Sequence, residues 1–524
     1  MDRSTIVESL KTNDIEWDIL IIGGGATGLG TAVDAASRGY KTLLIEQFDF
    51  AKGTSSRSTK LIHGGIRYLR QGNISLVTEA LKERGYLLKN ASHLVKNQSF
   101  IVPNYKWWEK PYYRLGFTLY DSLAGKLGFG KAKSLSKQII LKDIPDLRAE
   151  KLRGGILYYD GQFDDSRLAI NLMQTVFDHG GTAVNYLKAV QLIKIDGKIS
   201  GVVVEDQETS ESFDIKSKVV VNATGIFTDD IRRMDNDRAA PILQFSQGVH
   251  IVLDKKFYSS DSAMLIPKTE DGRVLFAVPW HNKVIVGTTD TPVDNAQIEP
   301  KALAHEIDYL LAYANKYLSK NLASTDIRSV FAGLRPLVRN GKNSKTKSIS
   351  RKHTLFTDES NLITITGGKW TTYRKMAEET VDLAVQVARL DKKDSVTANL
   401  KIHGWTKHNN REQPYAIYGS DAVEISKLSS RNGSLDKQLH PELPYDLVEV
   451  VWAVRNEMAR TVEDVLSRRT RALLLDARAS LECTHEVASL MAQEMGKDEK
   501  WISDQIQNYE KIANRYLLSY ESKI

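Results

Sequence analysis

The chain has 524 residues, of which 42% are hydrophobic and 26% charged, and these proportions exclude an intrinsically disordered protein. A chain of this length is expected to form two or three domains. Its formal net charge of +7 is compatible with an anionic substrate, an anionic membrane, nucleic acid or simple solubility.

Cysteine content and hydropathy narrow these classes. The single cysteine, Cys483, excludes a disulfide framework, an iron–sulfur cluster and a cysteine-ligated zinc site, and it fits a reducing compartment. We therefore expect no metal. Residues 1–17 are polar, and no apolar run approaches the roughly 18 residues of a membrane-spanning helix, so neither export nor a transmembrane anchor is expected.

An early stretch predicts a strand–turn–helix–strand unit that binds a dinucleotide. Residues 19–22 form an apolar run typical of a strand buried on both faces. Gly23, Gly25 and Gly28 follow with the G-x-G-x-x-G spacing, which permits a tight turn, leaves room for a pyrophosphate and lets the helix pack closely. Glu46 ends the second strand, where its carboxylate can accept hydrogen bonds from an adenosine ribose. The alternative is an ordinary structural turn.

A segment rich in glycine and serine comes next, GTSSRSTKLIHGGIRYLRQGN at residues 53–73. Basic and aromatic side chains interrupt it, which favours a wrap around the cofactor over a solvent-exposed turn. Residues 76–90 then predict a helix, because leucine and alanine recur on one face.

Residues 104–137 combine cations with aromatic rings. Seven lysines and arginines stand against Glu109 and Asp121, among two tryptophans and several tyrosines and phenylalanines. Cations beside Trp and Tyr are typical of a membrane-headgroup interface. A solvated basic face over a core-packed helix is the alternative. No nucleic-acid fold signature accompanies the stretch, so we expect no nucleic acid as partner.

The remaining chain alternates between strands and helices. A helix is expected at residues 165–179, and a buried strand at 218–222 ends in small residues that would let a ligand approach the backbone. Residues 241–360 predict an antiparallel sheet, and residues 362–372 a further strand–glycine–helix junction. Beyond a charged linker at 391–395, the tail from about residue 444 predicts a helical domain.

Several of these segments, in this order, resemble the FAD-dependent glycerol-3-phosphate dehydrogenases, flavoproteins of the amino-acid oxidase-like group. The segments are IIGGGATGLG, GTSSRSTKLIHGGIRYL, VNATG, VHIVL, VGTTD, AGLRPL and TITGGKWTTYRKMAEE. The resemblance spans about residues 15–385, and EMARTVEDVLSRRTRALLLDARASLE at 457–482 extends it.

The resemblance implies an α/β fold with three parts. These are a Rossmann-like FAD-binding domain of the amino-acid oxidase type, an antiparallel β-rich substrate domain, and a C-terminal α-helical domain. The FAD domain is expected in discontinuous segments, about 15–100, 150–240 and 355–390, the substrate domain at about 101–149 and 241–354, and the helical domain at 396–524.

The implied reaction is oxidation of sn-glycerol 3-phosphate to dihydroxyacetone phosphate by hydride transfer from C2 to N5 of FAD, with electrons passed to a membrane quinone. The implied location is cytoplasmic, with peripheral attachment to the inner face of the cytoplasmic membrane, and a homodimer is the assembly to test. The alternative is a related oxidase that uses O₂ and releases hydrogen peroxide, although the extra insertion of that branch is not visible here. A non-enzymatic regulator that binds flavin or a phosphometabolite is a further alternative.

By the same resemblance, Arg67, Tyr68, Arg335 and Lys369 form an electropositive substrate pocket, and Arg335 and His250 are catalytic. Arginine suits a phosphate because its planar fork binds oxyanions in a bidentate manner. Histidine suits a base because its ordinary pKa is near 6.5. The alternatives are a structural histidine, a surface arginine before a proline, and a lysine that faces flavin N1 and C2=O.

The implied FAD ligands form a longer set, for which nothing indicates a covalent link. They are Gly23, Gly25, Gly28 and Glu46, then Thr54, Ser55, Lys60, Leu61, His63 and Gly64, then Ala223 and Gly225, and finally Gly368, Lys369 and Thr371.

Overall fold

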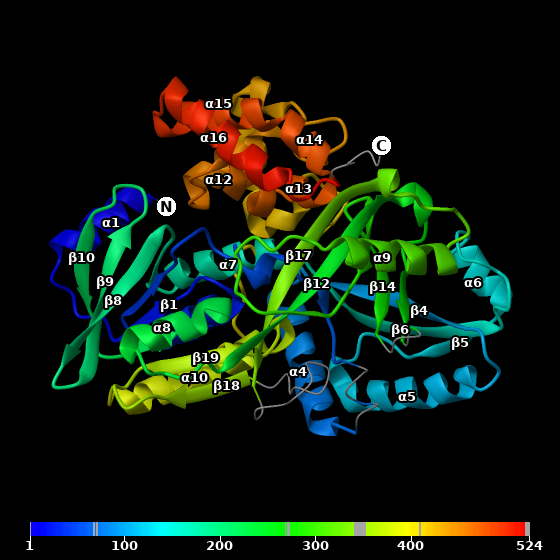
Figure 1. Cartoon of the computed structure of the whole chain (residues 1–524), viewed down its shortest axis with the longest axis horizontal. Coiled ribbons are helices and arrows are strands. Elements are labelled where there is room, and N and C mark those ends of the chain that lie inside the picture. The colour runs from blue at the N-terminus through cyan, green and yellow to red at the C-terminus, as the bar shows by residue number, and fades with distance from the viewer. Residues whose placement is uncertain are drawn as a thin grey trace.

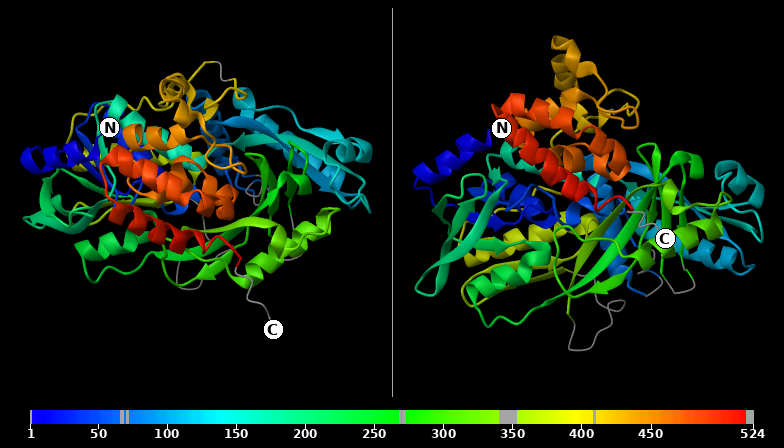
Figure 2. Two further views of the ribbon diagram at one scale, coloured as in Figure 1. Left: turned by 90° about the horizontal axis from the view of Figure 1, so that it is seen from above. Right: turned by 45° about the horizontal axis from the view of Figure 1, so that its top comes forward.

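The computed structural model describes residues 2–65, 69, 72–267, 269, 273–339, 353–407 and 410–518. Two sheet-based parts lie side by side, and a helical part covers their junction (Figure 1). Figure 2 shows from above that the helices of the last part lie across both sheets. The predicted α/β class with a helical C-terminal part is confirmed.

The first part is built on a six-stranded sheet with the order β18-β19-β11-β1-β2-β7. The strands are parallel except for β18. Their bounds are β1 (Ile19–Ile22), β2 (Thr42–Ile45), β7 (Thr182–Val184), β11 (Val220–Asn222), β18 (His353–Thr357) and β19 (Ile363–Gly367). Because the chain order reverses beside β1, the carboxyl ends of these strands form a crevice suited to a ligand.

Helices pack tightly on this sheet. They are α2 (Ala26–Ser37), α7 (Asp165–Asp178) and α10 (Tyr373–Val387). A Cβ at Gly30 would lie 2.7 Å from the ring of Tyr373, so the glycine sets how closely α2 approaches α10. The helix predicted at 165–179 is confirmed as α7.

A small antiparallel sheet extends this part on the left of Figure 1. It consists of β8 (Leu187–Ile195), β9 (Lys198–Asp206) and β10 (Ser212–Lys216), with α1 (Arg3–Thr12) and α8 (Thr228–Asp235) beside it. The buried Arg3 joins α1 to the sheet through an ion pair of 2.6 Å with Asp206.

The second part is a ten-stranded sheet with the order β16-β12-β15-β14-β13-β4-β6-β3, to which β17 adds beside β12 and β5 beside β6. All neighbouring pairs are antiparallel except β13 with β4, so the predicted antiparallel sheet is confirmed. The strands are β3 (Leu61–Ile62), β4 (Lys96–Asn104), β5 (Lys133–Leu135), β6 (Gly154–Gln162), β12 (Leu243–Asp254), β13 (Ala263–Ile266), β14 (Leu275–Trp280), β15 (Lys283–Gly287), β16 (Thr291–Val293) and β17 (Ile327–Val338).

Four helices accompany this sheet: α4 (Ile74–Asn90), α5 (Glu109–Ala124), α6 (Lys137–Asp143) and α9 (Ala304–Tyr317). The helix predicted at 76–90 is therefore α4, which begins two residues earlier. Although β6 falls in a segment predicted for the FAD domain, it pairs with β4 in the larger sheet. The division of the chain into domains stays a proposal.

The C-terminal part has a hydrophobic core of its own. Its helices are α11 (Ala422–Arg431), α12 (Leu447–Asn456), α13 (Ala472–Leu475), α14 (Ala477–Glu482), α15 (Thr484–Met495) and α16 (Glu499–Ala513), and a π-helical turn spans Asp464–Arg469. In the part of the chain that the structure describes, no helix combines the length and apolar character needed to cross a membrane.

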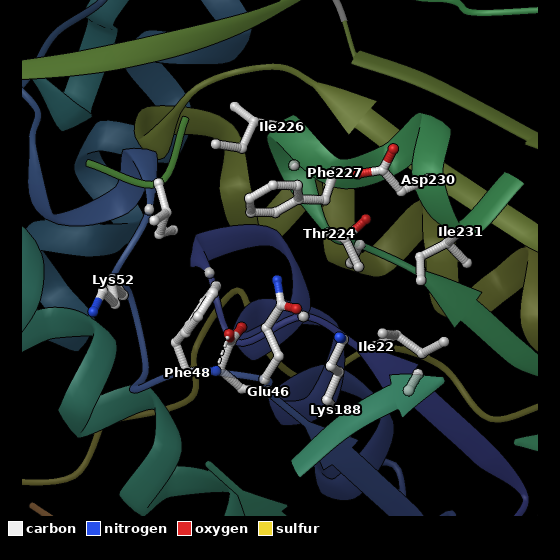
Figure 3. Close-up of a pocket in the computed structure, with 18 of the residues that line it drawn as sticks. Ile22, Glu46, Phe48, Lys52, Lys188, Thr224, Ile226, Phe227, Asp230 and Ile231 are labelled. Atoms are coloured by element: carbon white, nitrogen blue, oxygen red, sulfur yellow. Dashed lines mark hydrogen bonds between the residues drawn. The ribbon is translucent and has the colours of Figure 1, made fainter. Parts of the chain in front are cut away.

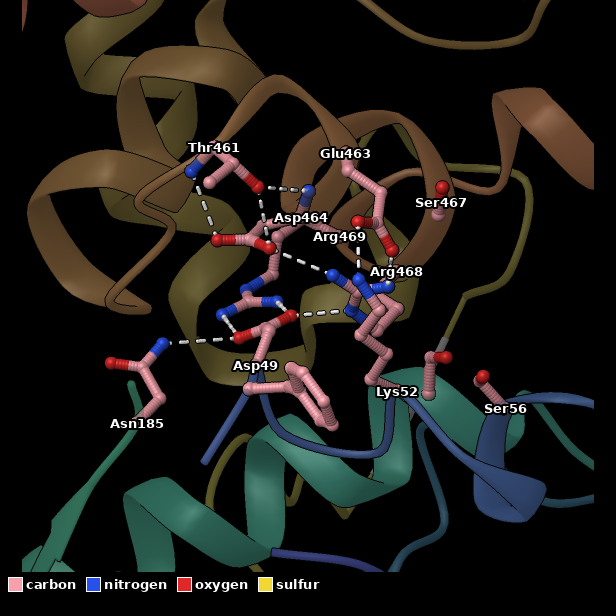
Figure 4. Close-up of polar contacts among 12 residues, drawn as sticks. Asp49, Lys52, Ser56, Asn185, Thr461, Glu463, Asp464, Ser467, Arg468 and Arg469 are labelled. Carbon is pink, nitrogen blue, oxygen red and sulfur yellow. Dashed lines mark hydrogen bonds and ion pairs between the residues drawn. The ribbon is translucent and has the colours of Figure 1, made fainter. Parts of the chain in front are cut away.

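A buried charge cluster joins this helical part to the first part (Figure 4). Asp49, in the loop after β2, accepts hydrogen bonds from the guanidinium groups of both Arg468 and Arg469. Beside them, Lys52 Nζ lies 2.6 Å from Glu463 Oε2. Burial alone would raise the pKa of Asp49, but the two guanidinium groups hold it well below its ordinary value. The loop after β2 is thus fixed from the C-terminal side.

Candidate active site

The turn between β1 and α2 has no room for side chains. Gly23 has φ +114°, and a Cβ there would lie 2.6 Å from the carbonyl oxygen of Ala223. A Cβ at Gly28 would overlap the carbonyl oxygen of Gly23. The N–H of Ala26, the first residue of α2, donates to Ser55 Oγ at 2.9 Å, and Gly25 caps the helix without a side-chain hydrogen bond, so bare backbone borders the start of the helix. This is the geometry that a pyrophosphate group requires.

Glu46 shapes the neighbouring loop. Its carboxylate accepts hydrogen bonds from the backbone N–H of Gly24 at 2.6 Å and of Phe48 at 2.9 Å. Burial raises the pKa of Glu46, and the two amide groups offset part of that rise. A carboxylate offers about four acceptor positions, so Glu46 retains capacity for a ribose hydroxyl.

A first cavity, of about 370 Å³, lies over the carboxyl ends of β1, β2 and β11. Figure 3 shows Glu46 and Lys188 on one side of it and Thr224, Phe227 and Asp230 on the other. Among the predicted FAD ligands, this cavity is lined by Gly23, Gly25, Glu46, Thr54, Ser55, Ala223 and Gly225.

A second cavity, of about 280 Å³, continues from the first and lies between the two sheets. Five residues line both cavities: Gly25, Thr54, Ser55, Ala223 and Gly225. The second is additionally lined by Leu61, His63, Gly368, Lys369 and Thr371 from the predicted FAD set. The two cavities together give an elongated space that begins at the glycine turn, as an extended dinucleotide requires.

The two described residues of the predicted substrate pocket, Arg335 of β17 and Lys369, line the second cavity, and so does His250 of β12, the predicted base. Strands β12 and β17 pair directly, with Ser246 opposite Arg335 and Phe331 opposite His250. Arg67 and Tyr68, the other two predicted substrate ligands, lie outside the described residues.

His250 is buried, and its neighbours fix the orientation of its ring. Its Nε2 lies 2.9 Å from Thr59 Oγ1, and its ring stacks on Phe331 with centroids 4.7 Å apart. A Cβ at Gly287 would overlap the imidazole, so the glycine makes space for it. Burial, together with the charges of Lys60 and Arg335, lowers the pKa of His250 well below 6.5. The imidazole is therefore neutral at pH 7.

Arg335 packs over Gly248, where any side chain would overlap the guanidinium group. The guanidinium donates to Thr288 Oγ1 at 3.1 Å and to the carbonyl oxygen of Thr289 at 3.3 Å, and lies 3.7 Å from Asp290. Its side chain is 25% exposed, so the group is held in place while it still faces the cavity.

The junction after β19 completes the cavity wall. Gly367 and Gly368 have φ +79° and +73°, which few other residues adopt. Thr371 Oγ1 accepts from the N–H of His63 at 3.3 Å and donates to the His63 carbonyl at 3.4 Å. These bonds tie the segment around Lys369 to the predicted cofactor wrap.

Three of the predicted FAD ligands line neither cavity: Gly28, Lys60 and Gly64. Gly28 instead packs against the carbonyl oxygen of Gly23. Lys60 is fully buried, and its ammonium group pairs with Asp165 at 2.7 Å and donates to the Ser56 carbonyl at 2.8 Å. Burial lowers the pKa of Lys60 to about 8. Gly64 donates its N–H to Tyr120 Oη at 2.8 Å, away from the cavity. Lys60 and Gly64 thus stabilise the glycine- and serine-rich segment from outside the two cavities.

The sequence did not single out Thr59, which contacts His250, or the cations Lys52 and Lys188 of the first cavity. Thr59 lies within the glycine- and serine-rich segment, but nothing in its spacing distinguishes it from the other hydroxyl residues there. Lys188 comes from the small antiparallel sheet, whose position over the glycine turn is a product of the tertiary fold.

Comparisons with known proteins agree with this geometry. A family model described as FAD dependent oxidoreductase matches residues 18–383, and one described as C-terminal domain of alpha-glycerophosphate oxidase matches residues 359–502. Mitochondrial glycerol-3-phosphate dehydrogenase of Homo sapiens is 40% identical over 98% of this chain and 75% of its own. The probable mitochondrial glycerol-3-phosphate dehydrogenase of Caenorhabditis elegans is 42% identical over 94% of this chain and 72% of its own.

A solved structure is similar over almost its whole length. The glycerol-3-phosphate dehydrogenase from Bacillus halodurans complexed with FAD superimposes with a TM-score of 0.81 at 29% identity, covering 99% of this chain and 98% of that one.

Proposed function

Because the chain belongs to the FAD-dependent glycerol-3-phosphate dehydrogenase family, we propose that it oxidises sn-glycerol 3-phosphate to dihydroxyacetone phosphate and passes the electrons to a membrane quinone. The observation that carries the proposal is the second cavity. In it a buried neutral imidazole, a guanidinium group and a lysine from three distant segments line one space that continues into the glycine turn.

FAD fits the two joined cavities. The glycine turn and the amide end of α2 would hold the diphosphate, Glu46 the ribose, and the segments around His63 and Thr371 the flavin end. When bound, FAD supplies the hydride acceptor of the reaction. The protein supplies position and charge.

Arg335 and Lys369 would bind the substrate phosphate. Two cations suit a phosphate dianion, and the guanidinium fork can donate two parallel hydrogen bonds. The contacts from Arg335 to Thr288 and Thr289 hold that fork in place before substrate arrives. Lys369 could instead face the flavin, and Arg67 and Tyr68 remain further predicted ligands.

His250 would act as the general base that takes the proton from the C2 hydroxyl group. Its lowered pKa keeps it in the proton-accepting form at neutral pH, and Thr59 fixes the ring by the contact to Nε2. Removal of the hydroxyl proton lets the C2 oxygen become a carbonyl as the C2 hydrogen leaves.

Helix α5 lies at the edge of the molecule in Figure 1, and its exposed side chains support a membrane attachment. Trp108, Tyr112, Leu115 and Leu119 recur every three or four residues and are 42–74% exposed, although large apolar side chains usually pack inward. Residues Phe117 and Tyr120 of the same helix are buried on the opposite face. An exposed apolar stripe beside lysines and arginines suits a helix that lies in the headgroup region.

We propose that the enzyme attaches peripherally to the inner face of the cytoplasmic membrane and passes its electrons to a quinone there. Sedimentation with anionic lipid vesicles tests the attachment: Trp108→Ser with Leu115→Ser should lose vesicle binding. Val423→Ser, an exposed apolar residue on α11, is the control. Equal sedimentation of all three proteins would contradict a role for α5.

The reaction itself is tested with purified holoenzyme. Anaerobic glycerol 3-phosphate should bleach the yellow flavin, and a quinone analogue should restore the colour in a second mixing step. Stoichiometric hydrogen peroxide in air, with no reoxidation by quinone, would instead favour the oxidase alternative. Binding of flavin without bleaching would leave only the regulator alternative.

A further inference from the structure

A third cavity, of about 260 Å³, shares no lining residue with the two cofactor cavities. Four distant segments line it: the start of β4, the junction of β6 with α7, the turn between β14 and β15, and residues 411–417 of the C-terminal part. Its polar lining residues are His93, Lys96, Gln162, Asp164, His281 and Arg411, and Trp280 supplies an aromatic wall.

Two cations in this lining repel one another. Burial and the charge of Arg411 lower the pKa of Lys96, and burial lowers the pKa of Arg411. Among the described residues, no carboxylate lies within ion-pair distance of either cation, and Arg411 donates only to the carbonyl oxygens of Ser92 and Val95. The nearby Asp261 is itself paired with Lys255 at 2.7 Å. Two unneutralised cations facing one small space favour an anion between them.

Asp164, which also lines this cavity, carries a buried acceptor atom. Asp164 is 4% exposed, and its Oδ2 atom has no hydrogen-bond partner among the described residues. That oxygen lies 3.8 Å from His281 Nε2 and 3.8 Å from Arg471 Nε, too far for a hydrogen bond to either. Because buried acceptors are nearly always satisfied, the Asp164 oxygen is suited to a donor that belongs to a ligand.

We propose that the third cavity is a binding site, separate from the substrate pocket, for a small phosphate monoester that carries a hydroxyl group. Lys96 and Arg411 bind the phosphate, since an ammonium and a guanidinium group together match a dianion. Asp164 accepts the hydroxyl hydrogen. The volume is just below the range of about 300–1,000 Å³ that is usual for ligand pockets, so the ligand has only a few heavy atoms.

The site lies against the support of the cofactor wrap. Arg471, beside Asp164, donates to the Ser56 carbonyl at 2.7 Å and to Asp165 at 3.1 Å, and Asp165 pairs with Lys60. Ser56 follows Ser55, which lines both cofactor cavities. A ligand bound to Asp164 is thus connected to the predicted cofactor wrap through two contacts, from Asp164 to Arg471 and from Arg471 to Ser56.

The test uses the holoenzyme of Arg335→Gln, in which the phosphate contact of the substrate pocket is removed. Calorimetric titration with glycerol 2-phosphate is expected to give one site per chain. Adding Lys96→Gln and Arg411→Gln should weaken that binding by about tenfold or more, because two charge-assisted contacts are lost. Lys96→Arg, which keeps the charge, should retain binding.

Lys497→Gln with Lys500→Gln is the matched control, because it removes two exposed positive charges elsewhere and should leave the affinity unchanged. Flavin content and melting temperature check that each variant is folded. Inorganic phosphate is expected to bind more weakly than the ester, since it leaves Asp164 without a second donor. Absence of binding to Arg335→Gln, equal affinity after loss of Lys96 and Arg411, or tighter binding of inorganic phosphate would each overturn the proposal. Turnover of wild-type protein tests the proposed function separately.

Discussion

Gly28 leaves no room for a side chain at the point where α2 meets the turn after β1. In Gly28→Ala the added methyl group overlaps the Gly23 carbonyl, so the helix end must move away from the bound diphosphate. Such overpacking costs about 1–3 kcal/mol, and we expect FAD to bind about tenfold more weakly. The ratio of flavin to protein absorbance after dialysis measures this. Gly433→Ala, where a Cβ meets nothing within 4 Å, is the control.

Arg335 is expected to hold the substrate phosphate. Arg335→Gln should lower kcat/KM by a factor of about 100 or more, because a phosphate without its charged partner loses roughly 3 kcal/mol of binding in the transition state. Arg335→Lys keeps the positive charge but loses the planar guanidinium group. Its kcat/KM should therefore lie between those of wild type and Arg335→Gln. Steady-state kinetics with glycerol 3-phosphate measures both, at unchanged flavin content. Wild-type kinetics in Arg335→Gln would remove this residue from the site.

His250 is expected to affect chemistry and not cofactor binding. His250→Asn should slow anaerobic flavin reduction by about 100-fold or more, the usual contribution of a general base. The protein should stay yellow, because His250 does not line the first cavity, which contains the glycine turn. Stopped-flow absorbance gives the rate. Thr59→Val should give a smaller decrease, as it removes only the contact that orients the ring.

The same histidine also makes stability depend on pH. Its pKa in the folded chain lies below the ordinary value of 6.5, so below that pH the unfolded chain binds a proton that the folded chain does not. The contribution of His250 is fully present above about pH 6.5 and is lost as the pH falls. Urea unfolding at pH 7.5 and 5.5 should therefore show a larger loss of stability for wild type than for His250→Asn. Equal losses would contradict a buried neutral imidazole.

Local sequence patterns predicted the individual strands and helices whose formation depends on neighbouring residues. The apolar run and glycine spacing gave β1 and the start of α2, and leucine periodicity gave α4 within two residues. The meeting of His250 with Arg335 depends instead on the pairing of β12 with β17. No spacing in the chain encodes that register, and resemblance to a family supplied the expectation.

Lys60 shows why contacts between distant parts of the chain could not be predicted. A lysine in a loop beside a phosphate-binding turn suits a ligand, but the structure pairs it with Asp165, which stands 105 residues further along the chain. A buried cation finds whichever carboxylate the tertiary fold brings near it. Sequence alone does not indicate that partner.

At the scale of the whole molecule, the charge cluster around Asp49 stabilises the contact between the C-terminal helical part and the first sheet-based part. Asp49→Asn leaves the buried Arg468 and Arg469 without the carboxylate that both contact. Removal of one partner from a buried pair costs about 3–5 kcal/mol, so the free energy of unfolding should fall by that order. Urea denaturation measures it. Glu424→Gln, which breaks an exposed ion pair with Lys427, should change stability by less than about 1 kcal/mol.

This cluster also has a consequence for synthesis on the ribosome. The loop after β2 is made among the first residues, yet the arginines that neutralise Asp49 are made more than 400 residues later. Until Arg468 and Arg469 have emerged from the exit tunnel, the loop beside the nucleotide pocket contains a carboxylate whose two charged partners do not yet exist. A nascent chain is therefore expected to capture its flavin only after translation is nearly complete, and a chain stopped early would remain colourless.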